Sequence, residues 1–275
     1  MEIISGTETR KKLLEEYKKT IAKEKLDIGL AIIQVGDNPS SNTYIRNKLK
    51  YTTEVGIKSE LIKLEENVSE EEVIRLIEKL NKDSKVTGII LQSPLPDHID
   101  FTKCARLISN EKDVDGFSEE NLFSIRDNNE KIIPCTVKGI LRLFEAYNID
   151  LEGKNIVVIG RSNIVGRPLA DALINRNATV TLCHSKTKDM KEYTKRADIV
   201  ISAVGKPKLI TKGMVKKDFI GIDVGINVVN GKLVGDFSKN TYEKASFITP
   251  VPGGVGPMTV AMIIDNLIEL KKNER

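Results

Sequence analysis

The feature that most constrains the fold is a regular alternation of short apolar segments with amphipathic segments along the 275 residues. Most of the apolar segments are rich in Val and Ile, and they run for only six to nine residues, which is typical of strands. Strand and helix in strict alternation imply right-handed crossovers and a parallel sheet covered on both faces. The sequence therefore predicts an α/β protein. The expected strands are 29–36, 59–64, 86–92, 154–160, 178–184, 197–205 and 219–225.

The helical segments follow the apolar periodicity and one clear start signal. Ser69 precedes Glu72 by three residues, which is the spacing of a capping box. The other expected helices are 9–25, 40–56, 137–149 and 259–272, together with helices between the strands that start at 154, 178 and 197.

The chain is long enough for two domains. Polar and turn residues interrupt the alternation at 123–139, so we expect the helix after them to lead into a second domain. The Pro/Gly-rich segment before the last helix can let that helix return to the first. The predicted domains are 1–137 with 258–275, and 138–257. Both are α/β, they flank a cleft, and the second is a Rossmann-like parallel sheet.

Charge and cysteine content exclude several classes of protein. The 43 basic and 39 acidic residues are spread along the chain and give a net charge of +4, too little to indicate nucleic-acid binding. Three scattered cysteines and two histidines argue against a metal site and against disulfides. No apolar stretch resembles a signal peptide or a membrane span. We expect a reduced, cytoplasmic protein.

A turn at the end of one strand is a candidate phosphate site. Gly160 and Gly166 flank the turn between the strand at 154–160 and the next helix, where Gly160 permits a sharp exit and Gly166 permits close packing. Backbone N–H groups and the helix dipole there favour phosphate. The spacing is not GxGxxG, and such a turn is often only a turn. A later strand ends in Val204 and Gly205, which suits close approach of a cofactor.

The end of the following strand favours NADP over NAD. NAD-binding domains use an acidic residue about 20 residues after the glycine turn to bind the ribose hydroxyls. Here the segment reads Cys183-His184-Ser185-Lys186, without a carboxylate. Ser185, Lys186 and Arg161 can bind a 2′-phosphate. The alternative is that Lys186 is a solvated loop residue, as most lysines are.

Six motifs together resemble the bifunctional methylenetetrahydrofolate dehydrogenase/methenyltetrahydrofolate cyclohydrolase family, also called the FolD family. They are "TYIRNKLKYTTEVGI", "GIILQSPLPDHID", "KDVDGF", "GRSNIVGRPLADAL", "ATVTLCHS" and "ITPVPGGVGPMT", in this order over nearly the whole chain. The resemblance implies a homodimeric enzyme of one-carbon folate metabolism and purine biosynthesis. Such an enzyme oxidises 5,10-methylenetetrahydrofolate with NADP⁺ and hydrolyses the methenyl product to 10-formyltetrahydrofolate.

The resemblance also assigns roles to individual residues. Lys48 becomes the central acid–base residue, with Tyr44 lining the folate pocket, Gln92 bonding to Lys48, and Asp115 binding the pterin. The implied cofactor contacts are Gly160, Arg161, Ser162, Ser185, Val204, Gly205 and Ile226. The implied backbone wall near the nicotinamide and folate is formed by Pro252, Gly253 and Gly256.

Local sequence alone supports a simpler interpretation of Tyr44 and Lys48, as ordinary residues on the surface of a helix. Tyr44 and Lys48 are four residues apart and share one helix face, but most helix lysines are solvated. Lys48 can act near neutral pH only if its ammonium form is destabilised by roughly 4 kcal/mol, which requires burial. The acid–base role therefore predicts a buried Lys48 that contacts Gln92.

Three positions depart from the usual family pattern: Ser93 for leucine, Ser118 for histidine and Val137 for proline. Because Ser93 adjoins Gln92, it can alter the hydrogen bonding of that amide. Two alternatives stay open, the first of them because of Ser93. One is a dehydrogenase with a weakened cyclohydrolase step, and the other is a non-catalytic protein that senses NADP.

Overall fold

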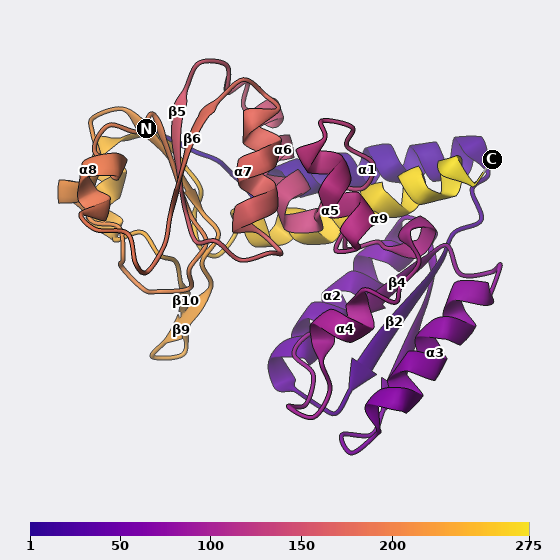
Figure 1. The fold of residues 1–275 in the computed structure, drawn as a ribbon. Coiled ribbons are helices and arrows are strands. Elements are labelled where there is room, and N and C mark those ends of the chain that lie inside the picture. Colours follow the sequence, from indigo (N-terminus) through magenta and orange to yellow (C-terminus); the bar gives the residue numbers. More distant parts are fainter. Residues whose placement is uncertain (275) are drawn as a thin grey trace. The chain divides into compact units, whose positions relative to one another are not determined.

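The computed structural model describes residues 1–274, with the side chain of Ser40 left aside. The chain divides into two compact units (Figure 1). The six-stranded unit comprises Met1–Lys11, Ile125–Asn129 and Thr136–Thr259. The three-stranded unit comprises Lys12–Ser124, Glu130–Cys135 and the residues from Val260 onward. Both units are α/β, so the predicted fold class is confirmed.

The three-stranded unit contains a fully parallel sheet in the order β3-β2-β4. The strands are β2 (Gly29–Val35), β3 (Lys58–Leu64) and β4 (Gly88–Leu91). Crossover helices α2 (Pro39–Glu54) and α3 (Glu70–Lys82) connect them. All residues of β4 and all but the first of β2 are buried, as their continuous apolar sequence predicts.

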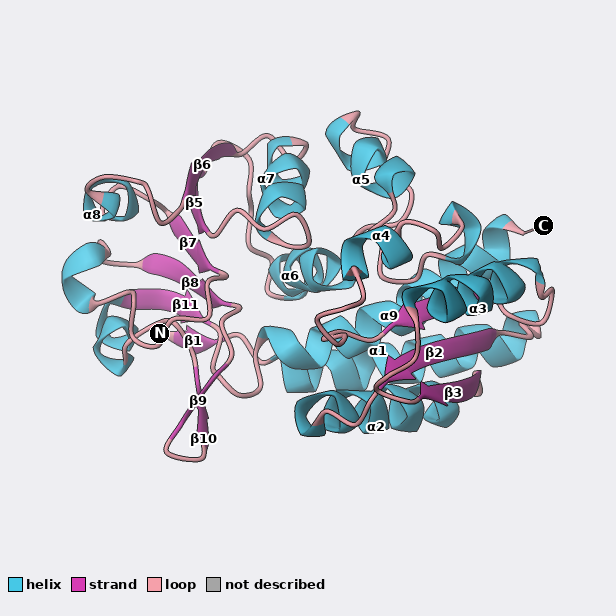
Figure 2. Cartoon of the chain, turned by 60° about the horizontal axis from the view of Figure 1, so that its bottom comes forward, coloured by secondary structure: helices cyan, strands magenta, loops and turns pink. Residues whose placement is uncertain are grey.

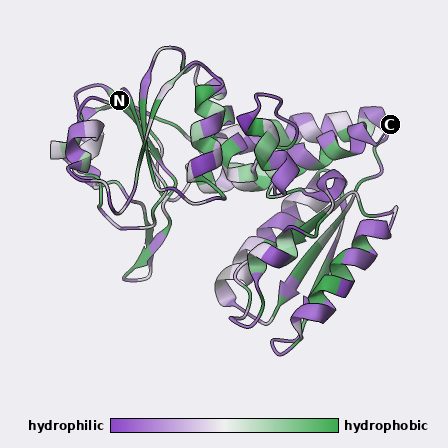
Figure 3. Ribbon diagram, in the orientation of Figure 1, coloured by the Kyte–Doolittle hydropathy of each residue, from purple (hydrophilic) through white to green (hydrophobic). Residues whose placement is uncertain are grey.

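Helix α3 begins where its capping box predicts. The Ser69 side chain accepts a hydrogen bond from the Glu72 backbone, and the Glu72 side chain accepts one from Ser69 N. Val73, Ile77 and Leu80 form its buried face, which is the hydrophobic side of α3 in Figure 3. Other elements with residues in this unit are α1 (Gly6–Glu24), α4 (Phe101–Ala105), η1 (Asn110–Lys112), α5 (Glu119–Arg126) and α9 (Val255–Asn273).

The six-stranded unit has the sheet order β1-β11-β8-β7-β5-β6, and every neighbouring pair is parallel (Figure 2). Its strands are β1 (Glu2–Ile3), β5 (Asn155–Ile159), β6 (Thr179–Cys183), β7 (Ile199–Ser202), β8 (Phe219–Asp223) and β11 (Ala245–Ile248). Its helices are α6 (Cys135–Ala146), α7 (Gly166–Ile174) and α8 (Met190–Thr194), with 3-10 turns η2 (Lys212–Met214) and η3 (Lys239–Lys244).

The sequence did not predict two strand pairings of this unit or the place of residues 1–11. Strands β1 and β11 are short and pair with each other, and β9 (Asn227–Val229) and β10 (Lys232–Val234) form an antiparallel hairpin. Because β1 pairs with a strand more than 240 residues later, residues 1–11 group with the six-stranded unit. The expected domain limits placed them elsewhere.

The strand order creates a switch point in the six-stranded sheet. The chain passes from β5 to β6 on one side, and β7 lies on the other side of β5. In open parallel sheets the crevice outside the carboxyl ends of two such strands is the usual ligand site. The turns after β5 and β7 both lie there, and they carry Gly160, Arg161, Val204 and Gly205. Within residues 1–274, no helix has the length and apolar character needed to cross a membrane.

Candidate active site

Lys48 lies on α2 and is 8 % exposed. Its Nζ donates a hydrogen bond of 3.0 Å to Oε1 of Gln92, the residue that follows β4. The plainer reading of Lys48 as a solvated helix lysine is therefore wrong. The hydrogen-bond partner of its Nζ is a neutral amide oxygen instead of a carboxylate.

The amide of Gln92 is oriented by a second hydrogen bond. Its Nε2 donates to the backbone carbonyl of Ser93 at 2.7 Å, so Oε1 faces Lys48. The same carbonyl accepts a hydrogen bond of 3.2 Å from the hydroxyl of Ser41, which is buried on α2. Because Ser93 acts here through its backbone, a leucine at this position would offer Gln92 the same acceptor. Sequence reasoning missed Ser41, for which the sequence holds no distinctive signal.

Tyr44 lies one turn before Lys48 on α2 and is 38 % exposed. Its partial burial raises the pKa of the phenol, so the group stays protonated at neutral pH. A protonated phenol can donate a hydrogen bond while its ring offers an apolar surface. This combination suits contact with a flat heterocycle.

Asp115 is partly exposed, and its carboxyl group has no hydrogen-bond partner within residues 1–274. Burial raises its pKa, the nearby Lys48 lowers it, and Asp113 raises it further. Because the Lys48 charge acts on this carboxyl group, the two side chains lie near each other in the three-stranded unit. A partly exposed carboxyl group without a partner in the described chain is available to a ligand that donates hydrogen bonds.

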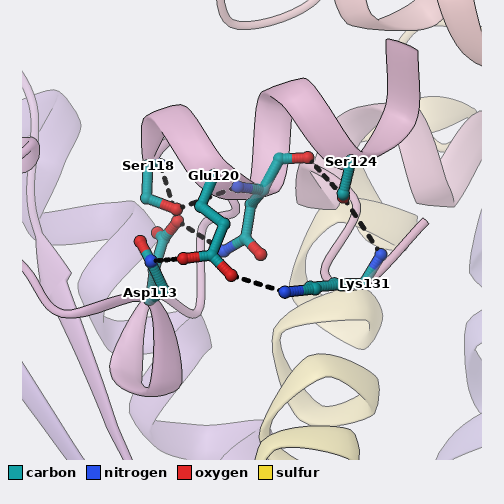
Figure 4. Close-up of polar contacts among 7 residues, drawn as sticks. Asp113, Ser118, Glu120, Ser124 and Lys131 are labelled. Atoms are coloured by element: carbon teal, nitrogen blue, oxygen red, sulfur yellow. Dashed lines mark hydrogen bonds and ion pairs between the residues drawn. The ribbon is translucent and has the colours of Figure 1, made fainter. Parts of the chain in front are cut away.

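Asp113 orders the loop that carries Asp115 (Figure 4). Its buried carboxylate accepts hydrogen bonds from Gly116 N at 2.9 Å, Ser118 N at 2.7 Å and Asn121 Nδ2 at 2.9 Å. Three such bonds to one carboxylate hold the turn on both sides of the α5 start. Sequence reasoning missed Asp113, although two aspartates within "KDVDGF" were a signal that one of them serves the loop itself.

Ser118 and the Glu120–Lys131 ion pair also stabilise the start of α5 and the loop after it. The Ser118 hydroxyl accepts a hydrogen bond from Asn121 N at 3.3 Å, which is the action of a helix N-cap, so a serine is well suited to this position. Figure 4 also shows Glu120 of α5 paired with Lys131, whose backbone N–H donates to Ser124 Oγ.

The turn after β5 has the predicted geometry. Gly160 has φ +113°, and a Cβ there would lie 2.6 Å from the Ala203 carbonyl oxygen. Helix α7 begins at Gly166, where a Cβ would lie 2.0 Å from the Gly160 carbonyl oxygen. The sharp exit at Gly160 and the close packing at Gly166 are thus confirmed. Because Ala203 follows β7, this contact also joins the two turns at the switch point.

Polar side chains surround this turn. Arg161, Ser162, Ser185 and Lys186 are exposed. The Ser162 hydroxyl accepts hydrogen bonds from Val165 N at 3.3 Å and Gly166 N at 3.4 Å, which cap the start of α7. Within the described chain, no acid or acceptor pairs with the guanidinium of Arg161. These groups can bind an anion without first breaking an ion pair.

The remaining predicted contacts lie on loops of the six-stranded unit, except Gly256, which lies in the first turn of α9. Val204 and Ile226 are each 46 % exposed, an unusual exposure for two apolar side chains near one sheet edge. A Cβ at Gly256 would lie 3.8 Å from Cδ1 of Ile226. Gly253 has φ +104°, follows Pro252, and its carbonyl accepts a hydrogen bond of 3.1 Å from Thr7 N.

The predicted residues therefore form one set in each unit. Tyr44, Lys48, Gln92 and Asp115 belong to the three-stranded unit. The predicted cofactor residues, and Pro252, Gly253 and Gly256 with them, belong to the six-stranded unit. Among residues 1–274, no group of three His, Cys, Asp or Glu side chains is arranged to hold a metal ion.

Comparison with known proteins also finds two parts in the chain, a catalytic domain followed by an NAD(P)-binding domain. Residues 4–115 match the catalytic domain of tetrahydrofolate dehydrogenase/cyclohydrolase, and residues 134–275 match the NAD(P)-binding domain of the same family. The chain is 49 % identical over 278 residues to the "Bifunctional protein FolD" of Campylobacter hominis, covering 99 % of this chain and 98 % of that protein.

Two solved structures are also similar. The bifunctional FolD methylenetetrahydrofolate dehydrogenase/cyclohydrolase from Campylobacter jejuni has a TM-score of 0.97 and 46 % identity, with 100 % of both chains covered. The methylenetetrahydrofolate dehydrogenase-cyclohydrolase of Trypanosoma brucei, solved with NADP cofactor and inhibitor, has a TM-score of 0.94 and 34 % identity. That match covers 99 % of this chain and 97 % of the other.

Proposed function

The chain belongs to the tetrahydrofolate dehydrogenase/cyclohydrolase family, and from this premise we propose that it catalyses both family reactions. It oxidises 5,10-methylenetetrahydrofolate with NADP⁺ and hydrolyses 5,10-methenyltetrahydrofolate to 10-formyltetrahydrofolate. The observation that carries the proposal is the buried Lys48 bonded to Gln92 at 3.0 Å, electrostatically coupled to Asp115.

Lys48 is the acid–base group of the hydrolytic step in this proposal. Water attacks the cationic methenyl carbon; one of its protons is released, and the other moves to a ring nitrogen as the C–N bond breaks and the formyl C=O forms. A buried amine can carry this proton, since it alternates between neutral and charged forms at one position. Gln92 directs the amine through a neutral hydrogen bond and adds no negative charge that would hold the proton there.

Asp115 binds the pterin ring. Its carboxyl group has no partner within the described chain, and the amino-pyrimidinone edge of a pterin offers two adjacent N–H donors that a carboxylate accepts. Asp113 supports this role because its carboxylate holds the loop directly after Asp115. Tyr44 covers the same pocket from α2.

NADP fits the groups at the switch point of the six-stranded sheet. The exposed Arg161, Ser185 and Lys186 can bind the 2′-phosphate, and no carboxylate at the end of β6 repels it. Gly160, Ser162, Val204, Gly205 and Ile226 line the edge beside them. When bound, the nicotinamide accepts the hydride from the folate. The chain itself must position the two molecules and exclude water, which can lower the barrier by roughly 7–11 kcal/mol.

The proposal also covers the roles of the two domains, the oligomeric state and the cellular location. Residues 1–137 with 258–275 serve folate binding and catalysis, residues 138–257 serve NADP binding, and Pro252, Gly253 and Gly256 approach both ligands. The matches at 4–115 and 134–275 support the order of these two parts. We also propose a homodimer in the cytoplasm, where the three buried thiols stay reduced.

The first alternative, a weakened cyclohydrolase, rested on the idea that Ser93 alters the hydrogen bonding of Gln92, and the structure gives no support for it. Ser93 reaches Gln92 through a carbonyl that any residue supplies. The NADP sensor is disfavoured because a sensor has no need of a buried lysine–amide pair in a separate unit.

One substitution with a matched control tests the proposal. Lys48→Met should abolish the accelerated loss of methenyltetrahydrofolate absorbance while NADP affinity changes little. Lys50→Met removes an exposed lysine from the same helix and should leave hydrolysis intact. Hydrolysis retained by Lys48→Met would refute the role of Lys48. Wild-type protein that binds NADP but reduces none with methylenetetrahydrofolate would support the sensor.

A further inference from the structure

A second buried carboxylate lies at the carboxyl edge of the six-stranded sheet, and the proposed chemistry does not use it. Asp236 is 0 % exposed and lies just after β10. Its Oδ2 accepts hydrogen bonds from Ser202 Oγ at 2.8 Å, Val204 N at 3.1 Å and Gly205 N at 3.3 Å. Its Oδ1 accepts one from Lys206 N at 2.8 Å. One carboxylate thus collects three consecutive backbone N–H groups of the turn after β7.

The same carboxylate also holds a second segment. Oδ1 of Asp236 accepts a hydrogen bond of 3.3 Å from Asn227 Nδ2. A Cβ at Gly225 would lie 2.0 Å from this oxygen, so the backbone there approaches as closely as only glycine allows. Ile226 lies between these two residues. Asp236 therefore touches both segments that carry the exposed Val204 and Ile226.

A further carboxylate fixes Asp236 in turn. Asp223, at the end of β8 and 3 % exposed, accepts hydrogen bonds of 2.9 Å from Asp236 N and from Phe237 N. A Cβ at Gly235 would lie 2.0 Å from Asp223 Oδ2. Since a buried acid is costly unless it is fully bonded, two acids in series indicate a selected arrangement.

We propose that Asp236 is a positioning residue for the cofactor, whose carboxylate holds the Val204–Lys206 and Gly225–Asn227 segments in the conformation that binds NADP. The inference rests on the proposed function, which places NADP at this edge. The ligand does not touch Asp236, because the acid is covered by the segments it holds. Its contribution is that these segments are ordered before NADP arrives, and a loop ordered only part of the time binds with proportionally weaker affinity.

Asp236→Asn is the direct test. The amide keeps the shape, but it replaces one acceptor oxygen with an N–H₂ group that faces backbone donors. We expect the dissociation constant for NADP⁺ to rise by about 10–100-fold, corresponding to a loop ordered in about one-tenth to one-hundredth of the molecules. The KM for NADP⁺ should rise in step, while kcat at saturating NADP⁺ changes much less.

Asp198→Asn is the matched control. Asp198 also accepts a backbone hydrogen bond, from Asn155 N at 2.8 Å, but it precedes β7 and lies at the opposite edge of the same sheet. Both substitutions should lower the thermal unfolding temperature. Only Asp236→Asn should weaken NADP⁺ binding, so equal dissociation constants for the two variants would overturn the inference.

The outcomes separate the two proposals. Wild-type protein that does not bind NADP⁺ would overturn the proposed function. Wild type that binds it, together with a folded Asp236→Asn of unchanged affinity, would overturn the positioning role alone. If Asp236→Asn does not fold, Ser202→Ala removes one of the five hydrogen bonds to the Asp236 carboxylate. It should raise the NADP⁺ dissociation constant by about 2–10-fold, and an unchanged constant would again overturn the inference.

Discussion

Replacing Gln92 with glutamate tests how Lys48 acts. The substitution keeps the side-chain length and places a negative charge about 3 Å from Lys48 Nζ, where Gln92 Oε1 lies at 3.0 Å. Two unit charges at this separation attract by about 5 kcal/mol at an effective dielectric constant of about 20. Because Gln92 is only half-buried, water reduces this energy. An opposite charge at this range shifts a titration by about 1–3 units.

The new carboxylate should hold the proton on Lys48. We expect the pH of half-maximal hydrolysis to rise by about 1–3 units and the rate at pH 7 to fall by about 10–1,000-fold, with recovery in more alkaline buffer. The assay follows the loss of methenyltetrahydrofolate absorbance between pH 6 and 9, corrected for the uncatalysed reaction.

Gln34→Glu provides the comparison for general effects of an added acid. Gln34 is buried in β2 of the same sheet, and its Nε2 bonds to Asn42 Oδ1 at 2.8 Å instead of to Lys48. It should lower stability without the same alkaline shift. An unchanged pH profile for Gln92→Glu, or equal shifts in both variants, would refute an acid–base role for Lys48 at this position.

Three further outcomes are expected. Asp113→Ala leaves three donors without their acceptor and should lower the free energy of unfolding by about 3 kcal/mol or more in urea; a smaller loss would mean the loop is held otherwise. Arg161→Ala and Ser185→Ala should each weaken NADP about 10–100-fold and NAD much less, so equal losses would argue against 2′-phosphate recognition. Burial raises the pKa of Asp223 from 3.8 to about 6, so the native state takes up the proton more readily than the unfolded chain. As pH falls from 7 to 4, the free energy of unfolding of the wild type should therefore rise by about 2 kcal/mol relative to that of Asp223→Asn. A difference between the two proteins that stays constant with pH would contradict this.

The sequence by itself determined the elements whose signals are local. The seven predicted strand segments all became strands, and the apolar runs of β4, β5 and β7 are buried almost throughout, as suits a parallel sheet covered on both faces. The start of α3 followed from Ser69 and Glu72, since a capping box lies within four residues. Gly160 and Gly166 were recognisable for the same reason, because a tight turn is a property of a few adjacent residues.

Only the tertiary structure decided which side chains meet. Lys48 bonds to a residue 44 positions later, and Ser202 bonds to Asp236, which is 34 positions later. Strand β1 is two residues long and carries no periodic signal, so its place beside β11 depends wholly on a distant partner. Asp113, Asp223 and Asp236 read as ordinary loop or strand-end acids in the sequence. Folding removes water from them and supplies backbone N–H groups instead, and this exchange is visible only when segments far apart in the chain are brought together.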